Sequence, residues 1–155
     1  MTEKFPISPA GLKLLHAEMH ALGTVEIPAA AAALADAKKL DAADGADYMA
    51  AKQRHDGVVA SLTNLEAILK RVEVIDPGRI SGLNAQFGSR VTLRNDDTEE
   101  ERSFRILGDY EAKHLPDTIS ISAALARSVI GKGVGASVKV PGSRGDMEII
   151  AIAQS

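Results

Sequence analysis

The clearest hydrophobic pattern in the chain runs from Tyr48 to Val72. Apolar or aromatic residues and one histidine recur there at alternating intervals of three and four: Tyr48, Ala51, His55, Val58, Leu62, Leu65, Leu69 and Val72. This spacing is typical of a helix that packs along a second helix. It predicts a helix from about Gly45 to Val72, roughly 40 Å long at about 1.5 Å per residue. On this seam His55 is interpreted as a packed histidine.

The segment upstream predicts the partner of this helix. Ser8 and Pro9 form an N-cap and first-turn pair, and a seam with the same spacing follows at Leu12, Leu15, Met19 and Leu22. Gly23 to Pro28 is expected to interrupt the helix, and an alanine-rich helix is predicted from Pro28 to about Leu40. The helices on either side of residues 41–47 then form an antiparallel hairpin with those residues at its far end.

The second half of the chain has the pattern of a small α+β domain. Ile75-Asp76-Pro77-Gly78 predicts the end of the long helix, so we expect two domains, at residues 1–76 and 77–155. Ser122 is the predicted N-cap of a short helix that Gly131 closes. Strands are predicted at Phe87–Leu93, Ser103–Leu107, Thr118–Ile121, Ser137–Val140 and Met147–Ile152, the first two as a hairpin.

Composition narrows the classes of function. The 155 residues are 45% apolar and 25% charged, which is typical of a globular protein. A net charge of -3, with three Phe, two Tyr and no Trp, does not suit a protein that binds nucleic acid unaided. No cysteine is available for disulfides or thiolate chemistry. With neither a secretory signal nor a membrane-spanning run, the expected location is the cytoplasm.

An acidic stretch at the predicted end of the hairpin is the main candidate site. It contains Asp41, Asp44 and Asp47, and basic residues flank it at Lys38, Lys39, Lys52 and Arg54. Mg²⁺ takes only one or two protein carboxylates and keeps several waters, so an exposed pair can complete a metal site that another molecule mostly supplies. The alternative is a solvated helical turn with ordinary charge pairs.

Three other patterns are weaker than they look. His16 and His20 are one turn apart, but no third zinc ligand is evident. Gly131 to Gly135 follows a predicted helix and lacks both nucleotide-binding patterns, which favours a turn. The spacing of the three aspartates is not that of a calcium loop.

Several linked motifs resemble the Gre transcript cleavage factors of bacterial RNA polymerase. The tip motif of that family, Gly-Asp-x-x-Glu-Asn-Ala-Glu/Asp-Tyr, aligns with residues 40–48, which read Leu-Asp-Ala-Ala-Asp-Gly-Ala-Asp-Tyr. The second half carries further motifs in the family's order: Phe87-Gly88-Ser89-x-Val91, Arg105-Ile106-Leu107-Gly108-Asp109-x-Glu111-Ala112, Ile119-Ser120, Leu125-Ala126-Arg127, Ile130-Gly131-Lys132 and Pro141-Gly142.

The resemblance implies an N-terminal antiparallel coiled-coil hairpin followed by a small α+β domain similar to the FK506-binding fold, with no implied isomerase activity. Family members bind RNA polymerase, with the globular domain on the rim of the secondary channel and the coiled coil inside it. Two tip acids, matched here by Asp41 and Asp44, help hold a second Mg²⁺ in the polymerase active centre. The polymerase then cleaves its backtracked RNA.

The same resemblance implies the remaining roles. The chain is expected to be a monomer and not an enzyme by itself, because it lends carboxylates to the polymerase, which supplies the Mg²⁺. Lys52 matches a basic family position, and Arg54 and Lys38 are close enough in sequence to join it in contacting RNA phosphates near the backtracked 3′ end. Contact with DNA is expected only through the polymerase, and none with membranes.

The tip also departs from the family motif. Leu40 replaces glycine, Asp44 replaces glutamate and Gly45 replaces asparagine. These differences keep a second function open, a secondary-channel regulator or inhibitor that occupies polymerase without stimulating cleavage. A coiled-coil interaction protein or isomerase with another partner is the third possibility.

Overall fold

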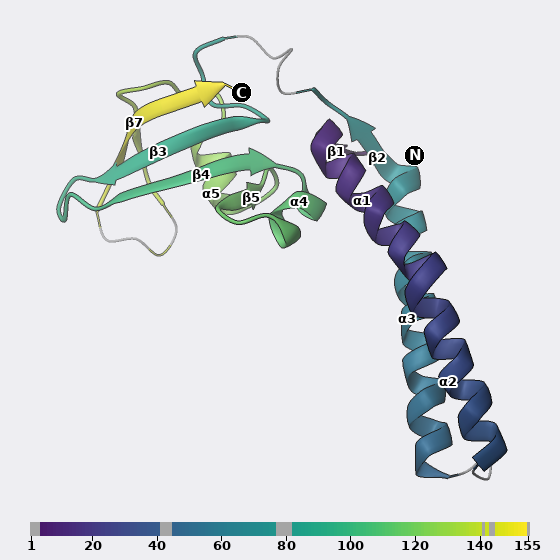
Figure 1. Ribbon diagram of the computed structural model, residues 1–155. Helices are drawn as coiled ribbons and strands as arrows, with labels where there is room; N and C mark the ends of the chain where they lie inside the picture. Colours follow the sequence, from purple (N-terminus) through teal and green to yellow (C-terminus); the bar gives the residue numbers. More distant parts are fainter. Residues whose placement is uncertain (1–3, 41–44, 77–81, 141, 143–144, 155) are drawn as a thin grey trace. The chain divides into compact units, whose positions relative to one another are not determined.

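The computed structural model describes residues 4–40, 45–76, 82–140, 142 and 145–154 (Figure 1). Contacts between Cα atoms divide the chain into a helical unit, residues 13–71, and a β-rich unit formed by residues 1–12 and 72–155. The predicted α+β class with a helical hairpin is confirmed. The predicted domain boundary at 76–77 stays a prediction, and the contacts group the N-terminal residues with the β-rich unit.

The helical unit is a hairpin of α2 (Ile27–Leu40) and α3 (Ala46–Arg71), which pack side by side and run in opposite directions (Figure 1). The predicted seam of α3 is confirmed, because every member is buried or half-buried, with Leu65 the most enclosed at 7% exposure. In α2 the buried residue is Ala30, at 0% exposure. A methyl group at this point lets the two helices approach closely.

The first helix, α1 (Pro9–Ala21), begins where the sequence predicts. The Ser8 hydroxyl oxygen accepts a hydrogen bond from the Gly11 amide at 3.1 Å, which is the expected N-cap. The predicted interruption between Gly23 and Pro28 is wrong. A π-helical turn, η1 (Leu22–Glu26), joins α1 to α2, and the Ile27 amide donates to the Leu22 carbonyl. The wider turn accommodates Pro28, which has no amide to donate.

The β-rich unit contains a five-stranded sheet in the order β5-β4-β3-β7-β6. β3 pairs antiparallel with both β4 and β7, β6 pairs antiparallel with β7, and β4 pairs parallel with β5. The strands are β3 (Ser89–Asn95), β4 (Glu101–Leu107), β5 (Thr118–Ser120), β6 (Ser137–Val138) and β7 (Met147–Gln154). All five match strands predicted from the sequence, with ends shifted by a few residues.

One face of this sheet forms the core with α5 (Ala124–Val129), which lies behind β3 and β4 in Figure 1. The fully buried side chains include Val91, Leu93, Phe104, Ile106 and Ile149, each at 0% or 1% exposure. Alternation along the strands places these residues on one face and polar residues on the other.

The cap predicted for α5 is wrong. Its N-cap is Ala123 and no side chain caps it. The Ser122 hydroxyl instead donates a hydrogen bond to Asp109 Oδ1 at 3.0 Å.

Three short elements of the β-rich unit were not predicted. The short strands β1 (Phe5–Ile7) and β2 (Val72–Val74) pair in parallel. Helix α4 (Asp109–His114) lies between β4 and β5 in the chain. No helix in the described ranges is long and apolar enough to cross a membrane.

A buried carboxylate ties the starts of α1 and α4 together. Glu111, at 0% exposure, accepts hydrogen bonds from the amides of Ser8 at 3.1 Å and Gly108 at 3.2 Å, and from the Ser8 hydroxyl. A Cβ atom on Gly11 would lie 2.5 Å from Glu111 Cδ, and one on Gly108 would lie 2.0 Å from the Pro6 carbonyl oxygen. Glycine is therefore required at both positions.

Candidate functional site

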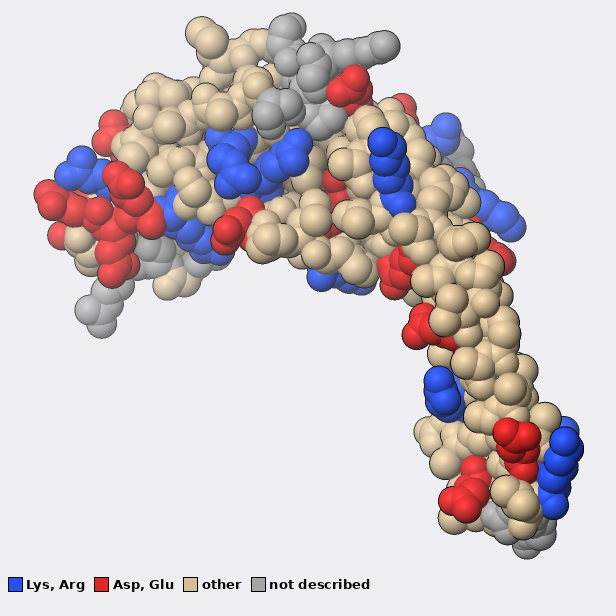
Figure 2. Space-filling view, in the orientation of Figure 1, with Lys and Arg blue, Asp and Glu red and all other residues tan. Residues whose placement is uncertain are grey.

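The candidate site is the end of the hairpin, where α2 stops at Leu40 and α3 starts at Ala46. Asp41 and Asp44 lie outside the described residues, so their predicted role stays a prediction. Asp47 lies exposed in the first turn of α3, where a negative charge interacts favourably with the helix dipole. Figure 2 shows acidic and basic side chains close together on the visible face of this end of the hairpin.

Lys38 and Tyr48 meet across the hairpin. The Lys38 ammonium lies 6.0 Å from the centroid of the Tyr48 ring, at the outer limit of a cation–π contact. The ring itself is half-buried on the seam. The contact links the last turn of α2 to the first turn of α3 and holds a positive charge beside the candidate site. Leu40, one residue before Asp41, is 88% exposed.

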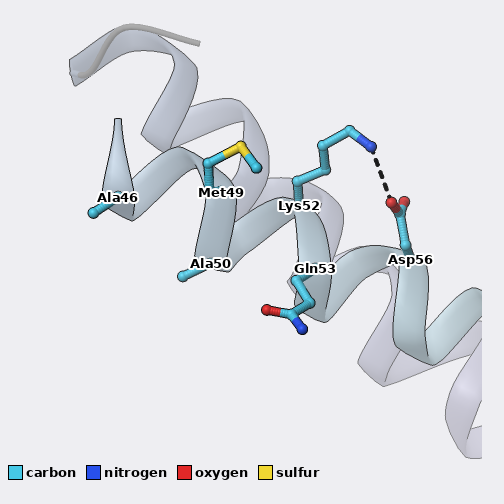
Figure 3. A pocket seen from close by; sticks show the side chains of 6 residues that line it. All are labelled: Ala46, Met49, Ala50, Lys52, Gln53 and Asp56. Carbon is cyan, nitrogen blue, oxygen red and sulfur yellow. Dashed lines mark hydrogen bonds and ion pairs between the residues drawn. The ribbon is translucent and has the colours of Figure 1, made fainter. Parts of the chain in front are cut away.

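Lys52 has a partner that the sequence analysis missed. Its ammonium lies 3.1 Å from Asp56 Oδ2, one helical turn further along α3 (Figure 3). The hydrogen bond and charge of Asp56 raise the pKa of Lys52. In return, hydrogen bonds from Lys52 and then His55 lower the pKa of Asp56. The i, i+4 spacing of these residues was the signal that could have predicted the pair.

His55 contributes to the same cluster from the seam side. Its Nδ1 atom lies 3.5 Å from Asp56 Oδ1, and its side chain is 27% exposed. Asp56 is therefore shared between an exposed lysine and a half-buried histidine. Because the Lys52–Asp56 pair is open to water, it stabilises the helix little, but it competes with any phosphate that Lys52 could contact.

A shallow groove runs along this side of α3. Its lining is apolar near the hairpin end and polar further along, as Figure 3 shows, with residues Ala46, Met49, Ala50, Lys52, Gln53 and Asp56. Met49 is 54% exposed and contributes apolar surface to the hairpin end of this groove.

Two of the predicted basic residues, Lys52 and Arg54, lie on different sides of α3. Arg54 is exposed on α3. It is two positions after Lys52, and side chains two positions apart on a helix point about 200° apart, so Arg54 lies on a different side of the helix from Lys52. Lys38 projects from α2 beside Tyr48. The predicted contacts of Lys38, Lys52 and Arg54 with RNA phosphates stay predictions.

Metal binding by the chain alone has no support in the described part of the structure. No group of three or more His, Cys, Asp or Glu side chains there could hold an ion. His16 and His20 are both exposed on α1. The chemistry of Asp41 and Asp44 fits Mg²⁺, which prefers carboxylate oxygens, but two carboxylates leave most of its coordination to other groups.

Two family models match the chain. "Transcription elongation factor, N-terminal" matches residues 5–74, and "Transcription elongation factor, GreA/GreB, C-term" matches residues 83–154. Transcription elongation factor GreA of Ruegeria pomeroyi is 38% identical over 99% of both chains. The chain belongs to the GreA/GreB family of transcription elongation factors. GreA of Paracoccus denitrificans is also similar, with 40% identity over 97% of each chain.

Solved structures of GreA/GreB-type proteins are also similar to the chain. The transcription factor Gfh1 is 26% identical, with a TM-score of 0.49, and the match covers 98% of this chain and 99% of that one. GreA/GreB from Nitrosomonas europaea is 20% identical, with a TM-score of 0.41 and coverage of 96% and 97%. The family assignment rests on the sequence matches.

Proposed function

We propose that this GreA/GreB-type factor binds bacterial RNA polymerase, inserts its helical hairpin into the secondary channel and stimulates Mg²⁺-dependent cleavage of backtracked RNA. The observation that carries the proposal is the position of two acids, Asp41 and Asp44, in the stretch between Leu40 and Ala46 that joins two packed helices. The second of these helices, α3, is about 39 Å long, taking about 1.5 Å for each of its 26 residues.

The slim hairpin suits entry into a channel. Ala30 is its fully buried residue on α2, and alanines occupy most of the first half of that helix. Small side chains keep the two helices close and the cross-section narrow. The half-buried seam of α3 keeps the arm helical up to its first turn, so that Asp47 and Tyr48 hold the start of the helix next to the acids.

The proposed division of labour assigns the metal to the polymerase. A water bound to Mg²⁺ loses its proton more readily, which is the chemistry the metal supplies. Asp41 and Asp44 add negative oxygens that attract the ion and accept hydrogen bonds from its waters. The Lys38 ammonium near Tyr48 and the Lys52 ammonium offer positive charge to the phosphates of the extruded RNA. The chain alone is therefore not proposed to be an enzyme.

A purified, backtracked elongation complex with 5′-labelled RNA tests the proposal. Adding the factor with Mg²⁺ should shorten the RNA from its 3′ end, and Asp41→Asn or Asp44→Asn should abolish the gain while binding to polymerase persists. Asp36→Asn, which removes an exposed acid of α2 outside the motif, is the matched control and should cleave normally. RNA hydrolysis by the factor without polymerase would contradict the division of labour.

A non-cleaving regulator is the second candidate, and the exposed Leu40 favours it. This side chain is 88% exposed and occupies the position of the glycine in the family motif. An apolar side chain beside the acids can contact the channel wall and change where the acids lie, and small displacements reduce catalysis strongly. Polymerase binding that slows elongation, with no shortening of the RNA, is the result that selects this function.

A further inference from the structure

The outward face of the five-stranded sheet carries an arginine pair. Arg90 of β3 and Arg105 of β4 are direct cross-strand partners, so their side chains project from the same face. Their neighbours Val91 and Phe104, also partners, project into the core on the other face. Figure 2 shows basic side chains gathered over β3 and β4 on the visible face of the sheet.

This pairing is unfavourable for the fold itself. Like charges directly opposite each other on a sheet repel. Neither guanidinium forms an ion pair with any residue in the described ranges, whereas Arg94 on the same strand pairs with Glu99 at 3.2 Å. The Nε atom of Arg105 is buried and has no hydrogen-bond partner among the described residues. The charges of the exposed Arg90 and the half-buried Arg105 are therefore not compensated by any ion pair among the described residues.

The residues beside the arginine pair are small or carry hydroxyl groups, and Arg90 itself is exposed. In the same row of the sheet Thr118 of β5 lies beside Arg105, and Ala153 of β7 lies beside Arg90. The next row holds Thr92 and Ser103, whose hydroxyl oxygens are 2.6 Å apart. Small and hydroxyl-bearing side chains around two guanidinium groups make a surface that can approach carboxylates closely and add hydrogen bonds to them.

The next row of this face, beyond Thr92 and Ser103, contains acidic side chains. Arg94 lies there between Glu101 of β4 and Glu148 of β7. The cationic part of the face is therefore about one row long and ends at acidic side chains. A long polyanion such as RNA or DNA would be repelled at that end, and the net charge of -3 gives it no general attraction. A short acidic segment of a protein fits the observed pattern.

We infer that the outward face around Arg90 and Arg105 docks an acidic protein segment, with the two guanidinium groups binding its carboxylates. The inference rests on the proposed function, under which the segment belongs to RNA polymerase. A planar guanidinium binds a carboxylate through two parallel hydrogen bonds, which a lysine cannot reproduce. Asp and Glu side chains two residues apart on an extended segment, or one turn apart on a helix, match a side-by-side arginine pair.

Equilibrium binding of the full-length chain to purified RNA polymerase at low and moderate salt tests the inference. Arg90→Gln, Arg105→Gln and the double variant should weaken binding, by about 10-fold or more for the double variant, and reduce the salt dependence. Arg94→Gln, which removes an arginine already paired with Glu99, should stay within about two-fold. Arg90→Lys with Arg105→Lys should restore only part of the affinity.

Arg90→Gln is the decisive single variant, because Arg90 is exposed and its replacement disturbs no buried group. Unchanged affinity of Arg90→Gln and of a folded double variant overturns the inference. So does a double variant that binds polymerase normally but loses binding to a labelled single-stranded RNA, because the face is then a nucleic-acid surface. Failure of the wild-type chain to bind polymerase overturns the assigned partner.

Cleavage of backtracked RNA separates this inference from the proposed function. At saturating concentration the double variant should cleave as the wild type does, whereas Asp41→Asn should bind normally and not cleave. If the wild-type chain binds through these arginines but never stimulates cleavage, the docking surface stands and the proposed cleavage function fails.

Discussion

The two units of this protein bury their apolar residues very differently. In the β-rich unit Val91, Leu93, Phe104 and Ile106 are at 0% or 1% exposure on one face of a sheet. Along the hairpin most of the α3 seam is only half-buried, and Leu65 is its one residue classed as buried. A two-helix arm has too little volume to enclose its seam. The β-rich unit is therefore packed more tightly than the hairpin.

Removing a core side chain of the β-rich unit should have the largest effect. Phe104→Ala deletes a ring at 1% exposure and leaves a cavity that the sheet and α5 cannot fill, so it should lower the free energy of unfolding by about 3–5 kcal/mol. Chemical denaturation measures this loss of unfolding free energy, and hydrogen exchange of the β3 and β4 amides measures it locally. A loss of unfolding free energy smaller than that of Leu65→Ala in the hairpin would contradict the contrast in burial.

Truncation of the hairpin seam should cost less. Leu65→Ala removes a side chain at 7% exposure, and the slender arm can partly close around the gap, so we expect a loss of about 2–3 kcal/mol. Val59→Ala, at a 38% exposed position of the same helix, is the control and should stay within about 0.5 kcal/mol. Exchange of α2 and α3 amides should report the difference. Equal effects of the two variants would show that the seam is not what holds the arm.

The buried carboxylate of Glu111, which joins the starts of α1 and α4, should also contribute to the stability of the β-rich unit. Glu111→Gln replaces one oxygen that accepts amide and hydroxyl hydrogen bonds with a donor, inside a site at 0% exposure. We expect a loss of about 1–3 kcal/mol, because buried donors lose their acceptor. Ser8→Ala, which removes the N-cap hydroxyl, should cost about 1 kcal/mol. Denaturation of both variants checks this order, and a neutral Glu111→Gln would contradict it.

The smallest effect should come from the exposed pair of Lys52 and Asp56. Because the pKa of Asp56 is lowered, the stabilisation that the pair gives is lost as the pH falls through the pKa of Asp56. Because the pKa of Lys52 is raised, the same stabilisation is lost as the pH rises through the pKa of Lys52. Helix melting of the wild type and Asp56→Asn should therefore differ only between these two pKa values. A difference that persists in acid, or that high salt leaves intact, would show another role for Asp56.

Asp56→Asn also tests the predicted contact of Lys52 with RNA phosphates. Releasing Lys52 from Asp56 frees its ammonium for phosphate, so Asp56→Asn should maintain or modestly raise affinity for a backtracked complex, measured against Lys52→Gln, which should lower it.

The sequence predicts what local periodicity encodes. The seam of α3 and the five strands of the sheet follow from repeats of three to four or of two, and the N-cap follows from the Ser8-Pro9 pair; all are confirmed. Two other contacts join residues far apart in the chain: the parallel pairing of β1 with β2 and the hydrogen bonds from Ser8 to Glu111. No local pattern in the sequence predicts them.

Turn chemistry was the weaker guide. The segment from Gly23 to Pro28 contains the usual helix breakers, yet a π-helical turn accommodates them and the helix continues. Ser122 has the right type for an N-cap, but Asp109, thirteen residues earlier, takes its hydroxyl. At the site, the resemblance to the family motif predicts the acids Asp41 and Asp44, and this stays a prediction, while the pairing of Lys52 with Asp56 follows from helix geometry.

The rate of RNA shortening in a backtracked elongation complex, at a factor concentration that saturates polymerase, is the direct test of the proposed cleavage function. We expect rapid 3′ shortening with the wild-type chain and with Asp36→Asn. With Asp41→Asn or Asp44→Asn we expect a loss of roughly 100-fold or more, at unchanged binding. Shortening that is no faster than with polymerase alone, although the factor is bound, would contradict that function.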